Sequence, residues 1–305
     1  MKKSFRMFLM AGLLALLPVM AFGQSNVSEV TQFGSDNIAD VSQTGNTNTA
    51  VIMQGDEALA VDGVSNSAKQ TQSGGTLNLE NIYQINEKNY AEQNQYNGES
   101  NEAFIVQDGS GDGNSAVQTQ GFNLPSTDNW AKIEQIGSGN VSTQTQDGLL
   151  NQAYINQKSL LNNASQTQSG DSNVANIFQD GDNMTATQNQ QGSGNSALVN
   201  QAGSGHSATQ TQSGVANTGE VYQTGSTNTA IQIQNGLSNY AKIEQYGTGN
   251  YAYQSQDSGV AIGTSAFALQ NGTSNWSSQT QTDTGHTSHV TQTGAFNTAT
   301  VVQGN

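Results

Sequence analysis

The chain contains no cysteine, two prolines and few cations. Without cysteine, an exported chain has no disulfides, so backbone pairing and side-chain stacking must stabilise it. Eight Lys and Arg are outnumbered by 23 Asp and Glu, which gives a net charge of −15. Because phosphate backbones attract basic surfaces, this acidity argues against nucleic acid as a partner.

Hydrophobic residues are also scarce, at 33% of the sequence, and only one long apolar run is present. That run, residues 7–20, follows three cations and precedes the small residues of 21–23. This pattern predicts a secretory signal peptide over residues 1–23, because the run is too short for a membrane span. Cleavage would leave five lysines against 23 acidic residues, a net charge of −18. We expect the remaining chain to be extracellular and to have no membrane span.

Residues 24–305 consist of one short pattern, repeated with changes. From Asn129 onward an anchor residue recurs every 11 residues, as at Asn140 and Asn151, and Met184 and His206 are the two exceptions up to residue 250. Glutamine always stands six residues after the anchor: Gln135, Gln146, Gln157, Gln168, Gln179, Gln190, Gln201, Gln212, Gln223, Gln234, Gln245 and Gln256. Fixed residues at 0, +2, +4 and +6 have the period of a strand face. The pattern predicts strands of about seven residues joined by turns of about four.

The residue four after the anchor alternates between two kinds. On one set of strands it is aliphatic: Ile133, Ile155, Ile177, Val199, Val221 and Ile243. On the other set it is glutamine, as in Gln144, Gln166, Gln188 and Gln210. A coil of 22 residues would stack like on like, and stacked amides can hydrogen-bond at about 4.8 Å spacing. We therefore expect an all-β fold, a two-sheet parallel β-solenoid of cross-β type with about 12 coils and two strands per coil.

The same geometry predicts which inward residues face each other. The +4 residue should face the alanine at +2 of the opposite strand, and the anchor should face the +6 glutamine. Glu80 falls at an inward +2 position, where a carboxylate is costly, so we expect a register slip or an open coil there. Residues 55–65, 121–128 and 257–263 should form bulged loops.

The +4 alternation also fails at both ends of the repeat region. Val30, Val41 and Ile52 follow one another without a glutamine, and so do Val290 and Val301.

No feature of the sequence indicates an enzyme, a cofactor or a metal site. His286 and His289 lack accompanying ligands, and residues 108–113 only faintly resemble calcium-binding repeats and occur once. We interpret the histidine pair and the segment 108–113 as residues at or beside turns. No nucleophile–base arrangement is visible in the sequence. Outward hydroxyls at +3 and +5, such as Thr143 and Thr145, offer a rival hypothesis of an ice-binding surface.

The unit resembles the curlin repeat, whose pattern is Ser-x5-Gln-x-Gly-x-Gly-Asn-x-Ala-x3-Gln. The segments 133–140 and 246–256 are similar to its core, and 193–201 also resembles it. The resemblance implies a structural subunit of an extracellular curli-type amyloid fibre that supports cell adhesion and biofilm matrix. It also implies three partners: further copies of the chain in a homopolymer, a curli-type nucleator and an outer-membrane secretion channel.

The sequence itself favours the same hypothesis, because no capping element is apparent at either end of the repeats and open edges template further strands. The alternatives are a curli nucleator subunit and a monomeric secreted solenoid that binds a surface, as an ice-binding protein or an adhesin.

Overall fold

The computed structural model describes residues 25–304 apart from 56–62, 110, 123–125 and 260–262. The described residues form strands and turns, and none of them is in a helix that could cross a membrane. The signal peptide expected at 1–23 lies outside the described residues.

The strands form two large sheets and one small one. The first sheet contains β1 (Val27–Gln32), β4 (Thr49–Gln54), β7 (Leu79–Asn86), β9 (Glu102–Gly109), β11 (Trp130–Ser138), β13 (Gln152–Leu160), β15 (Val174–Asp182), β17 (Ser196–Ser204), β19 (Thr218–Ser226), β21 (Tyr240–Thr248), β23 (Ser265–Thr273) and β25 (Thr287–Ala295). The second contains β3 (Ile38–Gln43), β6 (Ser67–Ser73), β8 (Tyr90–Tyr96), β10 (Ser115–Gln120), β12 (Val141–Asp147), β14 (Asn163–Asp171), β16 (Thr185–Ser193), β18 (Ser207–Val215), β20 (Thr229–Leu237), β22 (Tyr251–Asp257), β24 (Trp276–Thr282) and β26 (Thr298–Gln303). The small sheet pairs β2 (Gly34–Ser35) with β5 (Gly63–Val64).

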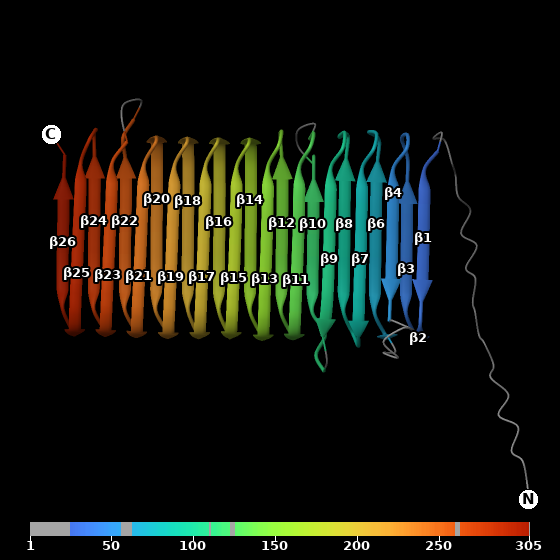
Figure 1. Ribbon diagram of the computed structural model, residues 1–305, viewed down its shortest axis with the longest axis horizontal. Helices are drawn as coiled ribbons and strands as arrows, with labels where there is room; N and C mark the ends of the chain where they lie inside the picture. The colour runs from blue at the N-terminus through green and yellow to red at the C-terminus, as the bar shows by residue number, and fades with distance from the viewer. Residues whose placement is uncertain (1–24, 56–62, 110, 123–125, 260–262, 305) are drawn as a thin grey trace, which may run out of the picture.

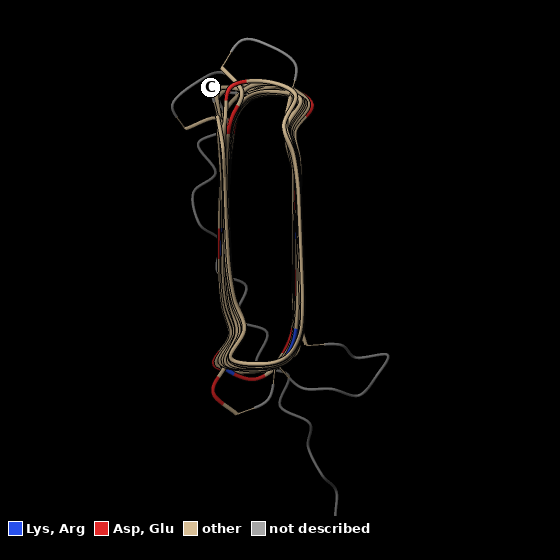
Figure 2. Ribbon diagram, turned by 90° about the vertical axis from the view of Figure 1, so that its left-hand side faces the viewer, with Lys and Arg blue, Asp and Glu red and all other residues tan. Residues whose placement is uncertain are grey.

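Successive strands alternate between the two large sheets, and every strand pairs in parallel with its counterpart one coil away. In the regular part this counterpart lies 22 residues along, so Ile133 pairs with Ile155 and Gln144 with Gln166. Figure 1 shows the strands side by side along the long axis, and Figure 2 shows the coils superposed as a flattened ring. These findings confirm the prediction of a two-sheet parallel β-solenoid, with 12 strands in each sheet.

The strands are longer than the sequence predicts. Many span nine residues, such as β14 and β17, and only two residues separate them from the next strand. The extension arises because the glycine eight residues after the anchor stays in the ladder at positive φ. Gly203, at φ 124°, pairs with Gly225, and a Cβ on it would lie 2.0 Å from the Gly225 carbonyl oxygen. Glycine is therefore required at that corner by close backbone stacking.

The core between the sheets is narrow and regular. Aliphatic +4 side chains of the first sheet pack against +2 alanines of the second, as the sequence predicts, with Ile133 and Ile155 fully buried. The +2 residues of the first sheet face the +4 glutamines of the second in the same way, since a Cβ on Gly219 would lie 3.0 Å from Gln232 Oε1. Each buried aliphatic side chain contributes about 1.5–3 kcal/mol to folding.

The three long turns leave both sheets in register. The paired residues Thr49 and Leu79 lie 30 positions apart, and Tyr240 and Ser265 lie 25 apart, yet the inward residues still match across each pair. The extra residues are thus confined to the turns, as the sequence predicts, although parts of these segments lie outside the described residues.

Glu80 corrects one of the sequence-based predictions. Its strand β7 neither slips nor opens: Glu80 pairs in register with Ala50 and Ala103, and its side chain is 0% exposed. Both carboxyl oxygens are buried without a hydrogen-bond partner, and burial raises the pKa of Glu80 well above its usual value. The neighbouring Ile82 and Gln84 hold β7 in place, because their columns would both be lost by a one-residue slip.

We predict that the solenoid is more stable in mild acid than at neutral pH, and that Glu80→Gln removes this difference. The folded state binds the Glu80 proton more tightly than the unfolded state, so stability is full below the unfolded pKa and falls as pH rises towards the folded pKa. The loss is about 1.4 kcal/mol per pH unit in that window. Denaturant unfolding at pH 4 and pH 7 measures it.

Glu102→Gln, on the exposed side of β9, is the matched control and should keep the wild-type pH dependence. If Glu80→Gln and the wild type lose equal stability between the two pH values, Glu80 is not the cause.

Candidate functional site: the stacked columns

The +4 glutamines of the second sheet form one continuous hydrogen-bonded column. In each step the side-chain Nε2 donates to Oε1 of the next coil, as from Gln144 to Gln166 at 2.8 Å and from Gln166 to Gln188 at 2.9 Å. The column runs from Gln70 to Gln279. In most of these amides the other N–H is used across the core, and Gln144 donates it to the Lys132 carbonyl at 3.0 Å.

The +6 glutamines form two more columns, one in each sheet. Gln135, Gln157, Gln179, Gln201, Gln223 and Gln245 belong to the first sheet, and Gln146, Gln168, Gln190, Gln212, Gln234 and Gln256 to the second. The columns extend to the terminal coils, from Gln32 to Gln292 and from Gln43 to Gln303. In all three columns the donor lies in the earlier coil, so each column has a direction.

The anchor residues serve the backbone at the turns. Asn129 Oδ1 accepts the backbone N–H of Asn151 at 2.8 Å, and Asn151 Nδ2 donates to the Gly170 carbonyl at 2.7 Å. His206 takes over the accepting role, because its Nδ1 accepts from the backbone N–H of Asn228 at 3.2 Å. Asn140 is likewise buried and accepts from Asn162. The 11-residue period identifies the anchors as repeated positions. It does not show that their side chains form hydrogen bonds with the backbone.

The aliphatic +4 residues form the fourth column. Ile133, Ile155 and Ile177 stack on one another in the first sheet, and Val199, Val221 and Ile243 continue the same column. All are buried. The glutamines, anchor asparagines and aliphatic +4 residues named from the sequence thus lie in four inward columns and two anchor rows.

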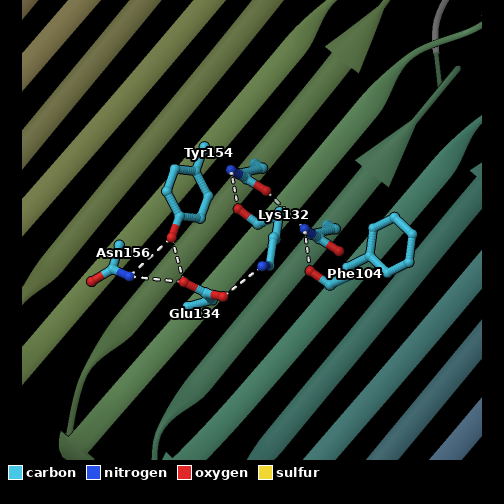
Figure 3. Close-up of polar contacts among 7 residues, drawn as sticks. Phe104, Lys132, Glu134, Tyr154 and Asn156 are labelled. Atoms are coloured by element: carbon cyan, nitrogen blue, oxygen red, sulfur yellow. Dashed lines mark hydrogen bonds and ion pairs between the residues drawn. The ribbon is translucent and has the colours of Figure 1, made fainter.

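A polar cluster that the repeat pattern does not predict lies on the outer face of the first sheet (Figure 3). Glu134 forms an ion pair with Lys132 at 2.5 Å, and Tyr154, one coil on, donates a hydrogen bond to the same carboxylate. Asn156 donates to it at 2.8 Å. The cluster follows from the register, since it joins +3 and +5 residues of adjacent coils.

Burial of the cluster acts to raise the pKa of Glu134, but hydrogen bonds from Lys132 and Tyr154 outweigh it and lower that pKa. Burial and the bond to Glu134 raise the pKa of Tyr154 to about 12. These groups keep their ordinary charge at neutral pH, so the cluster supports the sheet surface rather than proton transfer.

Of the two histidines that suggested a metal pair, His286 precedes β25 and His289 lies within it. His286 takes the inward anchor position, whereas His289 is exposed and contacts Phe267 at 4.6 Å between ring centroids. Among the residues that the structure describes, no three His, Cys, Asp or Glu side chains gather in a group able to hold a metal ion.

The outward hydroxyl column that raised the ice-binding hypothesis is interrupted. Thr143, Ser165, Thr187 and Thr209 stack in register, but Ile231 and Tyr253 follow them. Next to this column the ring of Tyr251 stacks on that of Trp276, with 6.2 Å between the ring centroids. The outer face of the second sheet is therefore mixed in chemistry along its length.

Comparison with known families identifies one part of the repeat region. Residues 214–247 match the curlin associated repeat. This stretch is a curlin repeat. The matched residues cover β19, β20 and most of β21, and the inward columns of these strands continue through the neighbouring coils. A search of curated proteins found no match for the chain. A curlin repeat in a β-solenoid points to a structural protein of the curli type.

We predict that Gln188→Ala destabilises the soluble chain by about 2–4 kcal/mol. The change removes the bonds from Gln166 and to Gln210, leaves those buried amide atoms unpaired and opens a small cavity. Denaturant unfolding followed by circular dichroism measures the loss. Thr187→Ala, on the outward side of the same strand, should change stability by less than about 0.5 kcal/mol. Equal effects of the two variants would show that the amide column does not stabilise the coil.

Proposed function

We propose that the chain is a structural subunit of an extracellular curli-type amyloid fibre, which assembles end to end and supports cell adhesion and biofilm matrix. The observation that carries this proposal is the set of continuous inward columns. Each coil offers the next one in-register partners for its backbone and for its stacked side chains, so a terminal coil is a template for another chain of the same kind.

The curlin repeat supports the extracellular setting. An acidic, cysteine-free chain with an expected secretory signal is consistent with export before assembly. By the same likeness, a curli-type nucleator and an outer-membrane secretion channel are its proposed partners, besides further copies of itself. A polymer-forming subunit is favoured over a nucleator because the coils are regular from Trp130 to Thr248.

A monomeric surface-binding solenoid is the second candidate. An ice-binding surface needs a flat, uniform array, and the interruption at Ile231 and Tyr253 argues against one on the second sheet. The aromatic pair of half-buried Tyr251 and exposed Trp276 would suit an adhesin as well as lateral contact between fibres.

We expect purified residues 24–305 to form fibres that bind thioflavin and are visible by electron microscopy. Fragments of these fibres should remove the lag phase when they are added to fresh soluble chain, because each fragment offers ready-made terminal coils. A chain that stays monomeric at concentrations of tens of micromolar, and depresses the freezing point of water, would instead establish the second candidate.

A further inference from the structure

The first and last coils share inward residues that differ from those of the interior. The first coil, β1 and β3, presents Ser28, Val30 and Gln32 on one side and Ala39, Val41 and Gln43 on the other. The last coil, β25 and β26, presents Ser288, Val290 and Gln292, and Ala299, Val301 and Gln303. These two sets match at each of the six positions.

Two of these positions set the terminal coils apart from the rest. In the second sheet the +4 column is glutamine from Gln70 to Gln279, but valine at both ends. In the first sheet the +2 column is serine only at the two ends, Ser28 and Ser288. The same two exceptions thus occur at opposite ends of the rod, more than 250 residues apart in the chain.

Within a single chain, Val41 is unfavourable. Gln70 lies directly next to Val41, and its buried Oε1 has no hydrogen-bond partner. A glutamine at position 41 would supply that partner, as glutamine does in the interior steps of this column. A buried, unpaired amide oxygen costs about 1–3 kcal/mol of stability. We therefore expect valine at position 41 to make a favourable interaction that the single chain does not contain.

The direction of the columns determines which ends can meet. Every glutamine column donates towards the later coil, which places amide donors of Gln292 and Gln303 at the C-terminal face. The acceptor oxygens of Gln32 and Gln43 lie at the N-terminal face. Donor meets acceptor only when the last coil of one copy lies on the first coil of another, and the strands then also remain parallel.

We propose that a second copy of this chain docks head to tail through these matched coils, with Val301 on Val41 and Ser288 on Ser28. The register continues the internal one, so Thr287 pairs with Val27 and Thr298 with Ile38. The proposal rests on the fibre function proposed above and adds the polarity and register of the junction. In this register Glu29 lies beside His289 on the outer face, which brings an acidic side chain of one copy next to an imidazole of the other.

Disulfide trapping tests the junction, since the chain has no cysteine of its own. Val27 is 56% exposed and Thr287 faces outward, so Val27→Cys and Thr287→Cys leave the core intact. In the proposed register their Cα atoms lie about 4.8 Å apart, within disulfide range. Fibres of the double variant, oxidised and then denatured, should give a ladder of dimers, trimers and higher species on a non-reducing gel.

Three controls make the result specific. Each single cysteine variant should remain monomeric on the gel, whereas dimers from either one would indicate head-to-head contact. Val27→Cys with Thr291→Cys moves the second thiol by four residues, about 13 Å, and should give no ladder. Fibres of the first double variant without a ladder would overturn the junction but not the fibre. A chain that forms no fibres would overturn both.

A second experiment tests the role of the valines. Val41→Gln or Val301→Gln alone places a buried amide against a valine at the junction, so each should slow elongation from seeds by about tenfold. The double variant places Gln on Gln, restores the donor–acceptor pair, and should return to within about twofold of the wild-type rate. Val141→Gln and Val215→Gln, at exposed positions in interior coils of the same sheet, are matched controls that should leave the rate unchanged. A double variant no faster than the singles would contradict the match.

Discussion

The buried amide is the constraint on which the rest of this structure depends. A side-chain amide in a dry interior needs partners for both its donors and its acceptor, and most amides in this core find them along the rod axis and across the core. Gln144 gives one N–H to Gln166 and the other to the Lys132 carbonyl. Both bonds require the next coil to repeat the present one in register. The 22-residue period, the parallel strands and the flat sheets follow from that requirement.

The alternation of Ile133, Gln144 and Ile155 was sufficient to predict the fold. Because each coil must stack like residues on like, two kinds of +4 residue imply two strands per coil. The two-residue period places the fixed side chains of each strand on one face, so these faces of the two strands must face each other. The residues of the columns were therefore identifiable from sequence. The direction of the columns could not be identified from sequence. It depends on whether each amide donates to the earlier or to the later coil, and the same glutamines could form a column in either direction.

Two local predictions failed because neighbours outweigh a single residue. Glu80 taken alone favours a slip, but its strand shares inward columns through Ile82 and Gln84, so the carboxyl is buried in place. A turn of about four residues after the +6 glutamine would include the glycine at +8, yet Gly203 remains paired because Gly225 stacks on it in the next coil. The outer cluster around Glu134 was missed for a different reason: its members lie on adjacent coils and become neighbours only once the register is known.

The long turns show where the rod tolerates additional chain. Between Tyr240 and its partner Ser265 the sequence is three residues longer than in a regular coil such as Trp130 to Gln152, and both sheets continue unchanged. Each such corner is an insertion point that leaves the axial repeat untouched. In a head-to-tail rod, 12 strands per sheet at about 4.8 Å place equivalent corners roughly 60 Å apart. A peptide grafted into one corner would thus be displayed as a single file at a fixed molecular interval, with spacing set by the chain itself.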